Sequence, residues 1–275
     1  MAKQEHTGTL TQTELKDARQ RSSPKAVIVY EAIRQEGEEE LARANAALFW
    51  SGLAAGLSMG FSFLLEALLT MHIATAQWRP LVTKFGYCIG FIIVVLGRQQ
   101  LFTENTLTPI LQLLHRKDRQ TLAAVARLWA IVLGSNLMGA AIFALLMHAM
   151  VSVKADLGGE LTSIGLKIYQ SPFAATLLSA VFAGWLIALM IWLLPVAESG
   201  RVTIIVLVTY VVGLGGFAHI IAGSVNAFYI LMEGGATLSG FITRFFIPTL
   251  LGNITGGVAF VAAINYAQAS PENEN

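Results

Sequence analysis

Six long apolar runs constrain the fold of this chain more than any other feature. They cover roughly residues 47–73, 81–114, 122–151, 173–195, 201–232 and 241–267. A helix needs about 20 predominantly apolar residues to cross the hydrocarbon core of a bilayer, and each run is long enough. The chain is also 55% hydrophobic and only 13% charged, which is too apolar for an ordinary soluble domain. We therefore predict an all-α integral membrane protein with six transmembrane helices in a lipid bilayer.

Two of these runs are interrupted at corresponding places. Residues 97–106 interrupt the second run, and residues 216–225 interrupt the fifth; they align without a gap at a separation of 119. The pattern Asn-x-x-Gly recurs at residues 136–139 and 253–256, a separation of 117. Broken helices at matching positions of two halves are typical of transporters with an inverted repeat. Because each half has three spans, we predict an inverted 3+3 repeat with spans 2 and 5 interrupted.

The distribution of polar and basic residues predicts the remaining organisation. We expect residues 1–23 to be a disordered cytoplasmic tail and residues 24–46 a cytoplasmic helix. A channel domain at 47–267 follows, with repeat halves of about 47–151 and 173–267, and then a tail at 268–275. With six spans, eleven Lys and Arg residues outside the spans share the side of both termini, and five lie opposite. The positive-inside rule therefore predicts that both termini are cytoplasmic.

Several functional classes lack a signal in this sequence. The net charge of +1 gives no nucleic-acid footprint. The five histidines are not at metal-ligand spacing, and no HExxH, CxxC or P-loop pattern occurs. We accordingly predict no metal, no cofactor and no enzymatic activity.

Polar residues near the two breaks are the candidates for function. His219 lies about 18 residues into the fifth run, directly after a glycine-rich segment, and an imidazole can exchange a proton near neutral pH. Arg98 and Glu104 flank the first break, and we favour a structural role for both as support for the loop. Asn136 and Asn253 either join helices or line a pore, and the sequence leaves both interpretations open.

At these residues the chain resembles the formate/nitrite transporter family. The family's Leu-Phe-Thr motif is matched at 101–103, its Gly-Phe-x-His motif at 216–219, and its Gly-Asn-x-x-Gly-Gly motif at 252–257. Residues 33–37 and 98–106 resemble a poorly characterised enterobacterial inner-membrane branch of that family. The resemblance implies an aquaporin-like fold, a homopentamer with one pore per protomer, and a location in the bacterial inner membrane. It also implies small monovalent anions, or their conjugate weak acids, of the formate or nitrite type as substrates.

The resemblance also assigns pore residues. It implies that Leu101 and Phe102 form an apolar constriction, and that Thr103 lies near the central His219. It implies that Asn253 lines a vestibule, and it suggests Lys167 as a candidate vestibule lysine.

The sequence departs from the family pattern at four positions, and these departures leave the substrate open. They are Gln100, Gly184, Ala218 and Gly223. Our leading hypothesis is a channel or transporter in which His219 exchanges a proton with a permeating weak-acid anion. One alternative is a channel for uncharged small solutes. Another is a non-conducting membrane scaffold or sensor that works through the helix at 24–46.

Overall fold

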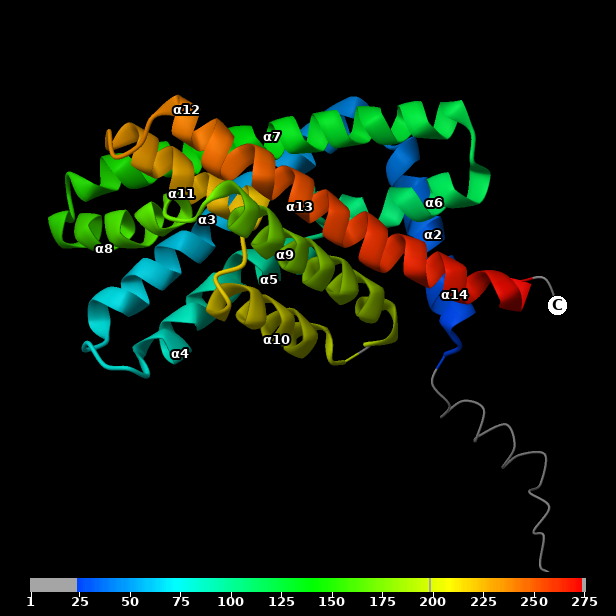
Figure 1. The fold of residues 1–275 in the computed structure, drawn as a ribbon, viewed down its shortest axis with the longest axis horizontal. Helices are drawn as coiled ribbons and strands as arrows, with labels where there is room; N and C mark the ends of the chain where they lie inside the picture. Colours follow the sequence, from blue (N-terminus) through cyan, green and yellow to red (C-terminus); the bar gives the residue numbers. More distant parts are fainter. Residues whose placement is uncertain (1–23, 198, 274–275) are drawn as a thin grey trace, which may run out of the picture.

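A computed structural model describes residues 24–197 and 199–273, and every regular element in these ranges is a helix (Figure 1). The predicted tail at 1–23 lies outside the described residues. The first half contains α2 Ala26–Ala42, α3 Asn45–His72, α4 Arg79–Thr83, α5 Cys88–Leu96, α6 Thr108–Arg116 and α7 Arg119–Val151. Short 3-10 turns at Lys84–Tyr87 and Glu104–Thr106 precede α5 and α6.

The second half of the chain begins after α7. It contains α8 Ala155–Leu166, α9 Phe173–Leu193, α10 Arg201–Leu214, α11 Ile220–Met232, α12 Leu238–Gly240, α13 Ile247–Gly257 and α14 Ile264–Asn273. The 3-10 turns Lys167–Tyr169 and Leu194–Val196 extend α8 and α9. The π-helical segments Phe241–Phe246 and Val258–Ala263 join α12, α13 and α14 into one long helix.

Five helical stretches among the described residues are long and apolar enough to cross a bilayer. They are 45–72, 79–96, 119–151, 173–196 and 238–269. The fifth apolar run of the sequence is divided between α10 and α11, of 14 and 13 residues, and neither qualifies alone. An all-helical membrane architecture is thus confirmed, whereas the sixth span stays a prediction.

Glycines allow the long helices of each half to pack closely. In the first half α3 packs along α7, and in the second half α9 packs along α13. A Cβ atom added at Gly56 of α3 would lie 2.1 Å from the carbonyl oxygen of Asn136 in α7. A Cβ atom at Gly184 of α9 would lie 2.2 Å from the carbonyl oxygen of Asn253 in α13. Only glycine fits either position, as in other close helix pairs of membrane proteins.

The molecule has two distinct ends along its long axis. Helix α2 packs against α6 and α14 at one end, and α8 lies at the other (Figure 1). We call these the α2 end and the α8 end. Helix α8 contacts α3 and α11, so the α8 end also contains the last turns of those helices.

The helix predicted at 24–46 is shorter in the structure, where α2 spans Ala26–Ala42. Pro24 lies before its first turn. Arg127 of α7 donates hydrogen bonds to the carbonyls of Leu41 and Arg43, at 2.6 and 3.4 Å. These bonds satisfy carbonyls that have no partner within the ended helix. At the other terminus α14 continues to Asn273, so part of the segment predicted as a tail is helical.

Candidate functional site

The chain leaves helical geometry between α5 and α6 and again between α10 and α11. Each break contains one residue in the left-handed backbone region, Arg98 with φ of 52° and Gly216 with φ of 62°. These two residues are 118 positions apart, so the gap-free alignment at 119 is wrong by one residue. Glycine adopts this conformation freely, whereas an L-residue such as Arg98 is strained there.

Asn136 of α7 holds the first break together. Its side-chain oxygen accepts the backbone N–H of Phe102 at 2.9 Å. Its amide nitrogen donates to the carbonyls of Gly52 and Gln100, at 2.8 and 2.9 Å. Ser51 Oγ accepts the N–H of Gln100 at 3.0 Å. Backbone groups freed by a break need such partners, because none is available in hydrocarbon.

Asn253 of α13 holds the second break with the same set of bonds. Its oxygen accepts the N–H of Ile220 at 2.8 Å, and its nitrogen donates to the carbonyls of Ala180 and Ala218, at 2.8 and 2.9 Å. Ser179 Oγ accepts the N–H of Ala218 at 3.0 Å. The scaffold of the first break is therefore built a second time from residues 117, 118 and 128 positions further along the chain.

Asn253 is buried at the second break, and the vestibule position expected for it stays a prediction. Its side chain is fully buried, and it lines neither of the two cavities described below. Because its amide oxygen and nitrogen are engaged by backbone groups, its side chain supports the break. Of the two interpretations that the sequence leaves open for Asn136 and Asn253, the helix-joining one fits the geometry of both.

A hydrogen bond between Thr103 and His219 joins the two breaks. His219 is the N-cap of α11, and its ring Nδ1 accepts the N–H of Ala222 at 3.2 Å. A neutral ring that accepts at Nδ1 carries its hydrogen on Nε2. Nε2 therefore donates to Thr103 Oγ1, at 2.8 Å. Both side chains are buried, and the ring of Phe91 packs edge-on against the imidazole at 5.1 Å.

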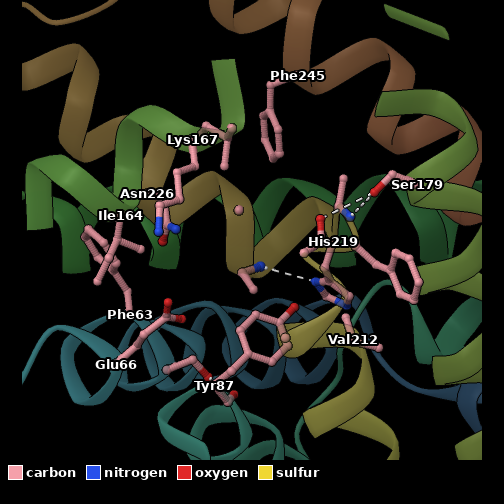
Figure 2. Close-up of a pocket in the computed structure, with 18 of the residues that line it drawn as sticks. Phe63, Glu66, Tyr87, Ile164, Lys167, Ser179, Val212, His219, Asn226 and Phe245 are labelled. Carbon is pink, nitrogen blue, oxygen red and sulfur yellow. Dashed lines mark hydrogen bonds between the residues drawn. The ribbon is translucent and has the colours of Figure 1, made fainter. Parts of the chain in front are cut away.

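His219 lines a cavity of about 160 Å³ that extends toward the α8 end (Figure 2). We call it the His219 cavity. Its charged lining residues are Glu66 of α3, Lys84 of the turn before α5, and Lys167 after α8. Tyr87 and Asn226 also line it, and the Tyr87 hydroxyl is buried without a hydrogen-bond partner among the described residues. The expected vestibule lysine, Lys167, thus lies in a cavity with the central histidine.

A second cavity of about 670 Å³ lies on the other side of the first break, at the α2 end. We call it the α2-end cavity. Its polar lining residues are Gln35, Glu36, Glu39, Glu40, Arg43, Arg98, Gln99, Gln100, Glu104, Thr108 and Arg201.

The two cavities share no lining residue, and the first break separates them. Gln100 and Glu104 line the α2-end cavity, whereas Thr103 between them bonds to His219 of the other cavity. Leu101 and Phe102 lie between Gln100 and Thr103 in the chain and are buried, at 0% and 1% exposure. We call this segment of the first break the partition. The apolar constriction expected at Leu101 and Phe102 stays a prediction.

Arg98 and Glu104, both predicted to support the loop, differ in their contacts. The Arg98 side chain is exposed, and its guanidinium forms an ion pair with Glu36 of α2 at 3.0 Å. It therefore ties the first break to α2, and no described bond joins it to the loop carbonyls. The buried Oε1 of Glu104 has no hydrogen-bond partner among the described residues.

The sequence does not reveal the contact between Glu40 of α2 and the first break. The Glu40 carboxylate accepts hydrogen bonds from Gln100 Nε2, at 3.1 Å, and from the hydroxyl of Thr108. Burial raises the pKa of Glu40 to about 7. The acidic pattern of this segment predicts only a solvated helix face. Partners 60 or more residues away in the chain determine which of its carboxylates contacts the break.

The apolar helices and the polar breaks between two cavities are the features of a membrane transport protein. The chain belongs to the formate/nitrite transporter family, since the family model described as "Formate/nitrite transporter" matches residues 27–267. Inner membrane protein YfdC of Escherichia coli is 37% identical over 91% of this chain and 81% of its own length. Formate channel BtFdhC of Bacillus thuringiensis is 23% identical over 90% of this chain and 96% of its own length.

Solved structures share the fold. An FNT family ion channel superposes with a TM-score of 0.74 and 19% identity, over 87% of this chain and 98% of that one. A pentameric formate channel with formate bound superposes with a TM-score of 0.68 and 21% identity, over 82% and 97%.

Proposed function

We propose that this chain conducts small monovalent anions, or their conjugate weak acids, across the bacterial inner membrane. The permeant enters the His219 cavity, passes Thr103 and His219, and crosses the partition at Leu101 and Phe102 into the α2-end cavity. The observation that carries this proposal is the Thr103–His219 hydrogen bond at the inner limit of the His219 cavity. Membership of the family and similarity to formate channels support formate or nitrite as the type of substrate.

We infer that α10 and α11 together form one interrupted span, and that the chain therefore has six spans in an inverted 3+3 repeat. The hydrogen bonds of Asn136 and Asn253, made twice with equivalent partners, support this arrangement. The α2 end, which contains the first and last described helices, α2 and α14, then faces the cytoplasm. The pentameric formate channel among the structural neighbours supports a homopentamer with one pore per protomer.

Proton exchange at His219 would solve the main energetic problem of this route. A bare anion in apolar surroundings faces a desolvation cost of several kcal/mol or more. Uptake of a proton by the ring requires that Nδ1 give up its bond to the Ala222 N–H. An anion held beside Thr103 would favour this exchange, because a nearby negative charge stabilises the imidazolium. The imidazolium then transfers its Nε2 proton to the anion beside Thr103, and the ring keeps the proton gained at Nδ1. This transfer yields a neutral acid for the crossing.

The test is formate uptake into proteoliposomes at several pH values. His219→Asn keeps an oxygen acceptor at the N-cap of α11 but removes the titratable ring. It should preserve folding and abolish the pH dependence of uptake, and His219→Phe should behave likewise. His148→Phe is the matched control, because His148 pairs with Glu233 outside both cavities. An unchanged pH profile in His219→Asn would exclude His219 from proton exchange.

A channel for uncharged small solutes is the second candidate. It is favoured by one observation: both ring nitrogens of His219 are already hydrogen-bonded in the neutral ring. Under this alternative His219 only presents a hydrogen bond through Thr103. Solute flux would then be indifferent to pH and to membrane potential, and His219→Asn would leave it nearly unchanged.

A further inference from the structure

The His219 cavity contains a carboxylate where a path for anions would be expected to contain only cations. Glu66 Oε1 lies 2.5 Å from Nζ of Lys84, and both residues line the cavity. The Glu66 side chain is only 7% exposed. A buried ionised group in a membrane helix is costly and is typically functional.

Close packing between α3 and the turn before α5 fixes the position of this pair. A Cβ atom added at Gly86 would lie 2.5 Å from the backbone nitrogen of Glu66, so only glycine allows this approach. Ser62, one turn earlier in α3, donates to the carbonyl of Tyr87 at 2.6 Å and accepts the N–H of Gly90 at 3.1 Å. This packing between α3 and the turn before α5 holds Lys84 beside Glu66.

The pair faces the other cation of the cavity. Figure 2 shows Glu66 and Tyr87 on one side, with Lys167 and Asn226 opposite. Glu66 neutralises Lys84, so these lining charges give a formal charge of +1, where the two lysines alone would give +2. Inside a low-dielectric cavity each unit of charge changes the local potential far more than it would in water.

We propose that Glu66 is a specificity-determining residue that lowers the attraction of the His219 cavity for anions by neutralising Lys84. Because the positive charge of the cavity is lower, the cavity disfavours anions of strong acids, such as chloride, which a proton does not neutralise near neutral pH. Weak acids remain able to enter, because part of their population is uncharged. The choice of ligand class rests on the proposed function, whereas the effect of Glu66 on the cavity potential does not.

Charged thiol reagents measure this potential without any transport. Ser171 lines the cavity and is exposed, so Ser171→Cys supplies a reporter in a Cys88→Ala background. The observable is the rate of modification by the anionic sulfonatoethyl methanethiosulfonate divided by the rate for the cationic trimethylammonioethyl reagent. Glu66→Gln should raise this ratio on the order of fivefold, since it adds one unit of positive charge to the cavity. An unchanged ratio would overturn the proposal.

Two further variants separate electrostatics from a loss of packing. Lys84→Met should lower the ratio, and Glu66→Gln with Lys84→Met should return it close to the parent value, because Lys167 again gives a formal charge of +1. A double variant that stays at the Glu66→Gln value would contradict the proposal. Glu160→Gln is the matched control, since Glu160 pairs with Arg79 at 3.5 Å outside the cavity lining. A similar rise in that control would also overturn it.

Chloride uptake into liposomes tests the specificity itself. Glu66→Gln should increase chloride uptake several-fold, and unchanged uptake would refute the role in selection. If the parent protein moves no formate while the reagent ratio responds to Glu66→Gln, the proposed function fails and the assignment of the cavity potential stands.

Discussion

Replacing Asn253 with leucine should remove the support of the second break at nearly constant volume. Ile220 N–H and the carbonyls of Ala180 and Ala218 lose their bonds to the Asn253 amide. A buried polar group left without a partner costs about 1–3 kcal/mol, whereas side-chain hydrogen bonds within membranes average only about 0.6 kcal/mol. Three such bonds place the expected loss at about 2–5 kcal/mol of the free energy of unfolding.

Titration with sodium dodecyl sulfate in dodecylmaltoside micelles, followed by circular dichroism, measures this loss. Asn136→Leu should lose a similar amount, because Asn136 makes the equivalent bonds at the first break. Asn226→Leu is the control, since its side chain lines the His219 cavity and makes none of these bonds. If Asn253→Leu unfolds within about 0.5 kcal/mol of the parent, the hydrogen bonds do not hold the break, and our reasoning is refuted.

Two further predictions concern helix packing and pH. Gly184→Ala should destabilise the protein by about 1–3 kcal/mol in the same titration, because its Cβ atom would meet the Asn253 carbonyl oxygen at 2.2 Å. Gly134→Ala, which meets nothing within 4 Å, should be neutral or stabilising, and equal losses would exclude the packing explanation. Burial raises the pKa of Glu40 from 4.5 to about 7, so the folded protein binds a proton at Glu40 more tightly than the unfolded chain does. The stabilisation that comes from this protonation is complete below pH 4.5, declines as pH rises to about 7, and is absent above about 7. Glu40→Gln should flatten this part of the stability profile when titrations at pH 5 and pH 8 are compared, and an unaltered profile would show that another group titrates.

The positions of the long helices could be predicted from the sequence because a bilayer imposes length and apolarity. Glycine and polar residues interrupt two of the runs, and helices α5 and α10 end at these interruptions. The sequence alignment of the two breaks, at a separation of 119 positions, differs by one residue from the separation of 118 in the structure. Aligning Gly97 with Gly216 matches identical residues, but in the structure Arg98 has the left-handed conformation equivalent to that of Gly216. Backbone conformation, which residue identity specifies only loosely, decides this equivalence.

The charged lining of the His219 cavity could not be predicted in the same way. Glu66 and Lys84 are 18 residues apart on different elements, and their contact depends on how closely Gly86 lets the turn approach α3. Sequence patterns describe one helix at a time and carry little information on such approaches. The family motifs, in contrast, indicated Thr103 and His219, and these two side chains are hydrogen-bonded in the structure.

The paired asparagines have a consequence for how such proteins diversify. Each asparagine amide forms hydrogen bonds with backbone atoms of its break. The backbone conformation of the breaks therefore does not depend on the side chains of the bonded residues. Gln100 and Ala218 occupy equivalent positions with unrelated chemistry, yet the polypeptide follows the same course at both. Substitution of side chains at the breaks, such as Gln100 or Ala218, should therefore leave the path of the backbone unchanged as long as both asparagines remain.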